Sequence, residues 1–315
     1  MALSKILPAG QSQFAGARNL VTNGSMQVAQ RGTQTGVRNS YGVDRFLCAG
    51  DGAQLFTYSQ STTVPSEQGF SYSAKLDVTT ADTSVAAGDY HLLVQRFEGQ
   101  NLQQLKYGTS SAESLTLQFW VRSPKTGTHI VELTHVDAGY QTSQAYTITS
   151  ADTWQKVIVT FDGYQTTAIT NDNTLRFTIN WWLMAGSTYS GGTLTPNTWH
   201  NTDANRAVGQ VNCVDNTANN FFLTGVQLEL GEQATPFEHR SFGDELLRCQ
   251  RYYYFSGFGG DIHPGDSDAA AAVDYEGRVM AVHIGSNRHT FFGNFPVFLR
   301  AIPTLTFYSP HDGAS

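Results

Sequence analysis

The stretch Leu115-Thr-Leu-Gln-Phe-Trp-Val-Arg122 decides the fold class of this chain. Every second residue from Leu115 to Val121 is apolar, and that period of two puts the apolar side chains on one face of a β-strand. Residues 157–161 repeat the same alternation. A strand with one apolar and one polar face is typical of an antiparallel sheet that packs one side against a core.

Similar segments recur along the chain between turns rich in Gly, Asp, Asn and Pro. Short strands at such spacing are typical of a sandwich. We therefore predict an all-β protein, an antiparallel jelly-roll sandwich over residues 41–238. The predicted strands cover residues 53–58, 71–78, 90–97, 114–121, 129–136, 144–148, 154–161, 175–183 and 221–230.

The regions outside the sandwich have a different pattern. Residues 1–40 are rich in Gly, Gln, Ser and Thr and predict an extended arm for virion attachment or packing. Residues 239–254 predict a linker with one short helix, with acidic residues in its first turn and arginines in its last. Residues 255–315 predict a small C-terminal β-unit with strands at 269–275, 277–284, 296–299 and 305–308. It has few residues for its own core, so we expect another copy of the chain to complete it.

Composition excludes several classes. Only 14% of the 315 residues are charged, against about 25% in an average soluble domain. Aromatic residues make up 12% of the chain, which excludes disorder, and the abundance of Thr, Ser, Gly, Asn and Gln excludes a coiled coil. The net charge of -7 offers no basic face for phosphates, so nucleic acid is not an expected partner.

The cysteines and the N-terminal sequence indicate in which cellular compartment the protein is made. Cys48, Cys213 and Cys249 are far apart and odd in number, which predicts free thiols in a reducing compartment rather than disulfides or zinc. Residues 1–10 lack the apolar core of a secretion signal, and no 18 apolar residues run together. We expect synthesis in the cytoplasm without a signal peptide and no membrane insertion.

No catalytic motif is present. The sequence has no phosphate-binding loop, HExxH or GxSxG, and we predict that the protein is not an enzyme and has no catalytic residues. A glycosidase would need paired carboxylates, and nothing in the sequence fixes a separation between any two of the candidates Asp51, Glu98, Glu113, Glu132, Asp137, Glu229 and Glu238. For Glu132 and Glu229 we favour a solvent-facing or ion-paired role.

No cofactor is predicted, and a structural calcium ion is left open. The neighbouring histidines, His129 with His135 and His283 with His289, lack the spacing of a zinc pair on a strand. Loop carboxylates and amides suit calcium better, although no ligands are assigned among Asp44, Asp51, Asp172, Asn173 and Asp215.

Aromatic residues in polar loops suggest a carbohydrate site. Tyr189 and Trp199 lie in a long polar insertion and Tyr140 lies in a turn. A sugar ring stacks on such side chains while neighbouring amides bind its hydroxyls. The alternative is that these aromatics anchor the loop to the domain. Trp181 and Trp182 are adjacent, so on a strand one of them faces the core.

Two stretches resemble a known module. Residues 19–33 (NLVTNGSMQVAQRGT) with 41–46 (YGVDRF), and residues 222–253 (FLTGVQLELGEQATPFEHRSFGDELLRCQRYY), are similar to the opening and the close of a jelly-roll module of bacteriophage tail fibres and other virion structural proteins. The resemblance covers the two ends of residues 19–254 and not the central loops.

The resemblance implies a carbohydrate-binding-module-like sandwich in a virion, assembled as a homotrimer with other phage proteins as partners. It implies a tail fibre or receptor-binding protein that contacts a bacterial surface polysaccharide. A capsid or baseplate decoration protein and a tailspike-type depolymerase remain alternatives. Packing near a three-fold axis, or within one chain, is the expected role of Phe237, Leu246, Leu247, Tyr252, Tyr253 and Tyr254.

Overall fold

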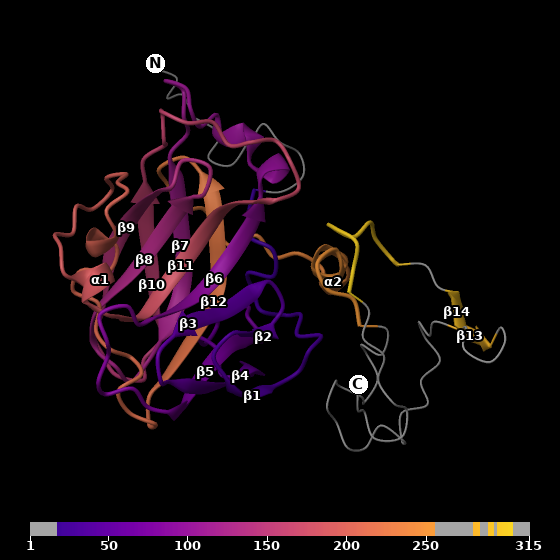
Figure 1. Cartoon of the computed structure of the whole chain (residues 1–315), viewed down its shortest axis with the longest axis horizontal. Helices are drawn as coiled ribbons and strands as arrows, with labels where there is room; N and C mark the ends of the chain where they lie inside the picture. Colours follow the sequence, from indigo (N-terminus) through magenta and orange to yellow (C-terminus); the bar gives the residue numbers. More distant parts are fainter. Residues whose placement is uncertain (1–17, 256–279, 284–288, 293–294, 305–315) are drawn as a thin grey trace, which may run out of the picture.

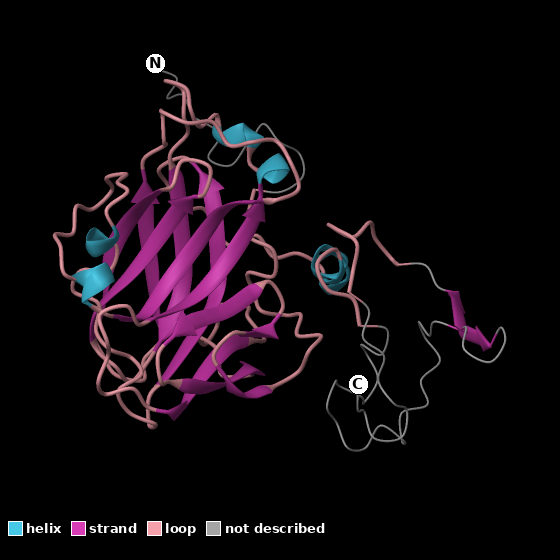
Figure 2. Cartoon of the chain, in the orientation of Figure 1, coloured by secondary structure: helices cyan, strands magenta, loops and turns pink. Residues whose placement is uncertain are grey.

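The computed structural model describes residues 18–255, 280–283, 289–292 and 295–304. Within these ranges the chain is an antiparallel β-sandwich of two six-stranded sheets, followed by a helix and a separate two-stranded hairpin (Figure 1). The prediction of an all-β jelly-roll sandwich is confirmed. The few helices lie outside the two sheets (Figure 2).

Each sheet draws its strands from the whole length of the sandwich. The first sheet has the order β1 (Gln34–Val37), β4 (Leu55–Ser61), β5 (Ser73–Thr80), β12 (Asn220–Leu230), β7 (Leu115–Arg122), β10 (Gln155–Phe161). The second sheet has the order β2 (Ser40–Val43), β3 (Phe46–Asp51), β6 (Tyr90–Glu98), β11 (Leu175–Ala185), β8 (Gly127–His135), β9 (Tyr140–Ile148). All nine strands predicted from the sequence are present, and β1, β2 and β3 were not predicted.

The core lies between the sheets. Leu115, Leu117, Phe119 and Val121 of β7 all point inward and are fully buried, as the alternation predicts. Phe119 meets Trp181 of the opposite sheet edge to face, with ring centroids 5.7 Å apart. Such an edge-to-face pair stabilises a core beyond the area that it buries.

The described part of the predicted arm lies against the sandwich. Val21, Met26 and Val28 are fully buried, and residues 34–37 and 40–43 are strands at the edges of the two sheets. The segment has no strand periodicity because asparagine side chains take over part of its backbone pairing: Asn23 bonds the amide and carbonyl of Val28. Residues 1–17 of the predicted arm lie outside the described residues.

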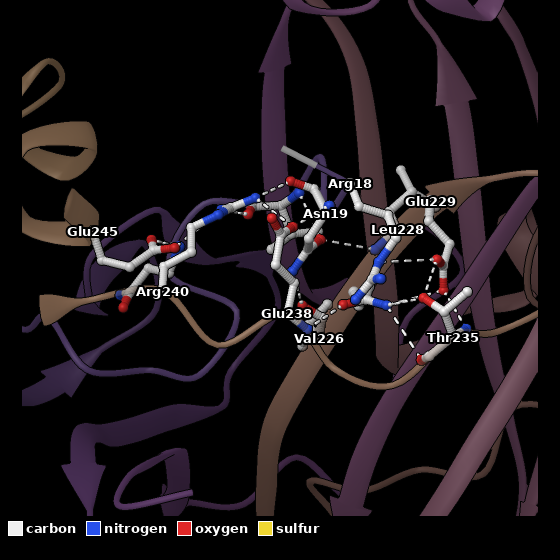
Figure 3. Close-up of polar contacts among 12 residues, drawn as sticks. Arg18, Asn19, Val226, Leu228, Glu229, Thr235, Glu238, Arg240 and Glu245 are labelled. Atoms are coloured by element: carbon white, nitrogen blue, oxygen red, sulfur yellow. Dashed lines mark hydrogen bonds and ion pairs between the residues drawn. The ribbon is translucent and has the colours of Figure 1, made fainter. Parts of the chain in front are cut away.

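Residues 18–24 run beside β12 and the chain that follows it, in a contact that we call the clasp (Figure 3). Asn19 donates from Nδ2 to the Val226 carbonyl at 3.0 Å and accepts at Oδ1 from the Leu228 amide at 3.1 Å. Gly24 fits here because a Cβ at this position would lie 2.1 Å from the Val226 oxygen. The Asn19 amide donates to Glu238 at 2.6 Å.

Charged side chains close the clasp at both ends. Glu229 accepts from the Thr235 amide at 2.8 Å and hydroxyl at 2.6 Å, and Arg18 lies 3.6 Å from it. Arg240 donates to the Val21 carbonyl at 2.9 Å and pairs with Glu245 of the following helix at 3.0 Å. The two stretches that resemble the virion module therefore meet in space (Figure 3).

The predicted helix is α2 (Phe242–Gln250). Ser241 caps it by accepting a hydrogen bond from the Asp244 amide at 3.2 Å, which satisfies one of the free amides at a helix N-terminus. The other helical segments are α1 (Ser187–Ser190) and single 3₁₀ turns at Gly99–Asn101, Gln103–Leu105 and Asp203–Asn205. No helix in the described ranges is long and apolar enough to cross a membrane.

The predicted C-terminal unit is described only in part. A hairpin joins β13 (Met280–His283) to β14 (His289–Phe292). Residues 296 and 297 form a bend and residues 298 and 299 have no regular structure, so that strand prediction was wrong; Pro296 has no amide hydrogen to give to a ladder. The predicted strands at 269–275 and 305–308 lie outside the described residues.

Candidate functional site

The outer face of the second sheet is partly roofed by the insertion at 186–213. Trp181 faces the main core and its neighbour Trp182 faces outward, as expected for adjacent residues on a strand. Trp182 packs with Leu92 and with Ala207 of the insertion, and its ring centroid lies 5.5 Å from that of Tyr189. This half of the face is therefore closed to ligands.

A buried ion pair fixes the insertion to the sheet. Glu132 of β8 is fully buried and accepts two hydrogen bonds from Arg206, at 2.9 and 2.8 Å. Asn180 and Thr134 also donate to this carboxylate, at 2.7 and 3.0 Å. Burial lowers the pKa of Arg206, but the Glu132 carboxylate outweighs it and the pKa lies above its usual value. Glu132 thus holds the insertion in place.

Beyond the insertion, polar side chains cross the sheet in one line that we call the polar row. Strand register pairs Arg96 with Thr178, Thr178 with Thr134 and Thr134 with Gln141. Arg96 is exposed and Thr134 is half-buried. Thr178 and Gln141 are buried, and the Gln141 amide lies 3.3 Å from Nδ1 of His200 in the insertion. The Arg96 guanidinium and Thr134 are therefore the members of the row that reach the surface, and a guanidinium and a hydroxyl are groups that bind sugar hydroxyls.

A pocket of about 180 Å³ lies at the Arg96 end of the polar row. Its walls come from the β2–β3 turn, the ends of β6 and β11, α2 and the segment 295–304. We call it the arginine pocket, because four of its residues are arginines: Arg31, Arg45, Arg96 and Arg300. Tyr41, Tyr252 and Tyr253 line it as well, together with Asp44 and Glu98.

The predicted sugar-binding aromatics fall into two groups. Tyr140 and Trp199 both contact Tyr164, with ring centroids 5.4 and 5.2 Å apart, and Trp199 donates from Nε1 to the Asp162 carbonyl at 2.8 Å. Tyr189 lies on the roof over Trp182. All three predicted residues are half-buried and anchor loops; sugar binding by them stays a prediction.

The predicted oligomer residues lie along the clasp and α2. Phe237 packs edge to face on Phe70 at 5.0 Å, and Leu246 is half-buried, whereas Leu247 is exposed. The three tyrosines that follow α2 pack within the chain: Tyr252 under Arg45, Tyr253 under Arg31 and Tyr254 against Phe295. Their role between copies stays a prediction.

The candidate catalytic carboxylates are engaged by cations. Among the seven candidates, Asp51 alone has no ion pair with a described residue. The Glu98 carboxylate is held by Arg251 at 2.7 and 2.8 Å; burial raises the pKa of Glu98, but the hydrogen bonds from Arg251 and Tyr252 bring it below its usual value. The remaining pairs are Glu113–Lys106, Glu132–Arg206, Asp137–Arg176, Glu229–Arg18 and Glu238–Arg240.

The cysteines are buried and free. Cys48 Sγ lies 2.9 Å from Nε2 of His91, but burial raises the pKa of the Cys48 thiol far above its usual value. A protonated thiol is a poor nucleophile, so this pair is part of the core.

No group of three or more metal-ligating His, Cys, Asp or Glu side chains occurs within the described ranges. Of the loop residues considered for calcium, Asp44 pairs with Arg31, Asp172 with Arg176 and Asp215 with Lys125. These carboxylates are already balanced by cations of the chain.

Sequence reasoning missed the arginine pocket. Arg31 and Arg45 lie in the module-like stretches 19–33 and 41–46, but Arg96 and Arg300 lie outside them, and the four arginines are spread from position 31 to position 300. The one available signal was Arg96, which follows the alternation of its strand on the outer face; the others come together only through the clasp and α2.

No family model matches this chain, and a search of curated proteins finds no match. Among solved structures, a carbohydrate-binding module in complex with β-1,4-galactotriose is 12% identical, with a TM-score of 0.36, over 68% of this chain and 99% of that one. The family 11 carbohydrate-binding module of a Clostridium thermocellum cellulosomal cellulase is 12% identical, with a TM-score of 0.31, over 67% of this chain and 98% of that one.

The enzymatically active domain of tailspike protein 4 of bacteriophage CBA120 is also similar, at 14% identity and a TM-score of 0.35. The match covers 68% of this chain but spans only 21% of the length of the tailspike chain. These likenesses assign no role to any residue of this chain.

Proposed function

We propose that this chain is a structural protein of a bacteriophage virion, a tail fibre or receptor-binding protein, and that it contacts a bacterial surface glycan. The contact is the polar row on the outer face of the second sheet. The observation that carries this proposal is the row itself: the exposed guanidinium of Arg96 and the half-buried Thr134 lie in register across neighbouring strands, with Thr178 between them. A glycan that lies along the row meets Arg96 and then Thr134.

The meeting of the two module-like stretches in the clasp supports the virion part of the proposal (Figure 3). Residues 19–24 and 226–245 resemble the ends of the virion module, and here they bond each other directly. The resemblance thus falls on the contact that closes the sandwich. The low charge of the chain, 14%, also suits neutral hydroxyl-rich ligands and close packing between copies of the same charge.

Adsorption then works by multivalency. In the homotrimer that we propose, three identical rows engage one surface, and linking weak sites raises the avidity by about 10²- to 10⁴-fold when the geometry allows them to bind together. We propose no catalytic role. Six of the seven candidate carboxylates are ion-paired, which favours binding over hydrolysis, because a glycosidase needs two carboxyl groups side by side, one of them free to give its proton.

The test is binding of the purified protein to host cells and to their extracted polysaccharide. Thr134→Trp places an indole across the polar row, and we expect it to weaken binding by about tenfold or more, the loss of one to two hydrogen bonds. Ile158→Trp is the matched control, because Ile158 is exposed on the first sheet, on the other side of the sandwich.

Absence of binding to both cells and polysaccharide at high protein concentration contradicts the receptor role and favours the second candidate, an architectural capsid or baseplate protein. That candidate is favoured by the exposed apolar residues Leu247, Phe298 and Ile302 beyond the sandwich. Release of reducing ends from the polysaccharide, abolished by one carboxylate substitution, would establish the depolymerase alternative instead. Electron microscopy of the virion places the chain on head or tail.

A further inference from the structure

We propose that the arginine pocket binds the anionic group of an acidic sugar unit, a carboxylate or a phosphate, in the glycan that the polar row contacts. The inference rests on the proposed function and adds a class of ligand and a second set of residues. The pocket, of about 180 Å³, is smaller than the roughly 300–1,000 Å³ of sites for drug-sized ligands. A space of this size suits one sugar unit and not a length of chain.

The pocket has an excess of positive charge that no described residue neutralises. Of its two lining carboxylates, Asp44 lies 3.5 Å from Arg31, and Glu98 is held in two hydrogen bonds by Arg251, which does not line the pocket. Arg45, Arg96 and Arg300 form no ion pair with any described residue. A chain with a net charge of -7 therefore gathers at one place three arginines that have no carboxylate partner within the described part of the chain.

Much of the hydrogen-bonding capacity of these arginines is also unfilled by the described residues, although Arg45 donates from Nη2 to the Arg96 carbonyl. No hydrogen bond from the guanidinium of Arg96 to another described residue occurs, and Nε of Arg45 is buried without a partner. Arg300 reaches the Asn173 carbonyl only at 3.4 Å from Nη1. A guanidinium has five N–H donors in a planar fork that matches a carboxylate or phosphate. An anion in the pocket would satisfy donors that the chain leaves unused.

Two of the arginines are held in place by aromatic rings before any ligand binds. The guanidinium carbon of Arg45 lies 3.4 Å from the centre of the Tyr252 ring, and that of Arg31 lies 3.4 Å from Tyr253. Cation–π contacts of this kind fix the fork and lower the entropy lost on binding. Burial raises the pKa of Tyr252 to about 12, so its hydroxyl stays protonated and its ring neutral.

The backbone conformation of Arg45 also supports a binding site at this position. Arg45 sits in the β2–β3 turn with a φ of +74°, a conformation that glycine adopts freely and residues with a side chain disfavour. Strained backbone of this kind concentrates at binding sites. The turn keeps an arginine where glycine would relieve the strain, because its side chain lines the pocket.

The position of Arg96 joins the pocket to the polar row. Arg96 lines the pocket and is also the first member of the row, opposite Thr178. When an acidic sugar unit occupies the pocket, the next sugar units of the same glycan therefore lie along the row, over Thr178 and Thr134. The acidic sugar unit then determines which glycan binds, and the row adds contacts to the neutral sugar units beside it.

Calorimetric titration of the full chain with single sugars tests the proposal. The probes are glucuronate, glucose 6-phosphate, glucose and inorganic phosphate. We expect glucuronate or glucose 6-phosphate to bind at least about tenfold more tightly than glucose, as a charge-assisted hydrogen bond requires. Which of the two binds assigns the charged group as carboxylate or phosphate. The affinity should fall as salt is added.

Arg96→Gln is the main variant, because Arg96 is exposed and the fold does not depend on it; Arg300→Gln is the second. Each should weaken binding of the anionic sugar by about tenfold. Arg248→Gln is the matched control, since Arg248 is exposed on α2 and does not line the pocket. Equal binding by the Arg96→Gln variant and the unaltered chain would overturn the proposal, as would equal affinity for glucose and the anionic sugars.

Binding of inorganic phosphate as tight as that of either sugar means an adventitious ion only, and overturns the proposal as well. The proposed function is tested separately, by measuring how tightly the Thr134→Trp variant binds polysaccharide. If the unaltered chain binds polysaccharide and the Arg96→Gln variant binds anionic sugars equally well, the proposed function stands and the pocket proposal fails. If the chain binds anionic sugars in the pocket but binds neither polysaccharide nor cells, the pocket proposal stands and the receptor role fails.

Discussion

Two histidines in the core must stay uncharged for the sandwich to hold. His91 lies between Cys48 and Gln54, with ring nitrogens 2.9 Å from the thiol sulfur and 2.8 Å from the amide nitrogen. Burial lowers the pKa of His91 to about 3 and that of His129 to about 4. His129 stacks on Tyr146 at 5.4 Å and points its Nε2 at the Lys125 carbonyl.

These lowered pKa values make stability depend on pH in a defined direction. In the unfolded chain the two histidines titrate near their usual pKa of about 6.5, so between about pH 6.5 and 4 the unfolded state binds more protons than the folded state. The contribution of these two histidines to the free energy of unfolding is therefore constant above about pH 6.5. It falls below that value by up to about 1.4 kcal/mol per pH unit for each histidine.

Urea unfolding at several pH values between about 7 and 5 measures this slope, in a range where carboxylates contribute little. His91→Gln should reduce the slope, and the exposed His239→Gln serves as its control. A free energy of unfolding that is level across this range would contradict the burial of neutral histidines.

Among the elements, α2 depends on the clasp for its place. Nine residues are too few for a helix to be stable alone. Glu245, nearly fully buried, accepts from the Asn23 amide at 2.5 Å and pairs with Arg240 at 3.0 Å. The helix is therefore tied to the N-terminal segment through one carboxylate.

Glu245→Ala tests this tie. Removing Glu245 leaves the Asn23 amide without its acceptor, and leaves Arg240 with Glu238 as its one remaining carboxylate among the described residues. Because part of the charge stays compensated, we expect a loss of about 2 kcal/mol in the free energy of unfolding, below the roughly 3–5 kcal/mol of a fully broken buried pair. Hydrogen exchange should rise in α2 and in residues 19–24 together. Glu232→Ala, at an exposed position, is the control. Faster exchange in α2 with residues 19–24 unchanged would mean that the tie is not what couples them.

The strands show what the sequence could and could not predict. Strands with one apolar face, such as β7, were predicted because their alternation is visible. In β3, Phe46 and Cys48 face the core, but Leu47 and Ala49 are apolar too and pack against the second cluster under the insertion. Both faces of β3 are covered, so no alternation remained to detect.

The same limit applies to the candidate site. The sequence analysis selected Tyr140, Tyr189 and Trp199, because an aromatic residue within a polar loop can be recognised from the sequence alone. The polar row depends on register between β6, β11, β8 and β9, and the arginine pocket on the approach of four distant segments. Neither is encoded by spacing along the chain.

At the scale of the whole molecule, the segment after the sandwich leaves apolar side chains in solvent. Phe298 and Ile302 are 94% and 98% exposed, and Leu247 of α2 is 44% exposed. A homotrimer would carry a net charge of three times -7, or -21, which works against association; apolar contact must therefore supply the attraction between copies.

We expect light scattering to give three times the chain mass of 34.5 kDa, and Leu247→Glu to shift the protein toward one chain. Ile158→Glu, also at an exposed apolar position, should leave the mass unchanged. A mass near that of one chain for the unaltered protein would refute the trimer.

The clasp also determines how the molecule carries mechanical load. The chain enters the sandwich at Arg18 and leaves it after Arg240, and these two points are bonded to each other's segments: Arg18 donates to the Pro236 carbonyl at 2.6 Å and Arg240 to that of Val21 at 2.9 Å. Tension applied along the chain from one side to the other crosses the clasp within a few residues. The two sheets lie beside this path, so we expect a pull along the chain to leave the outer face of the second sheet undistorted until the clasp itself breaks.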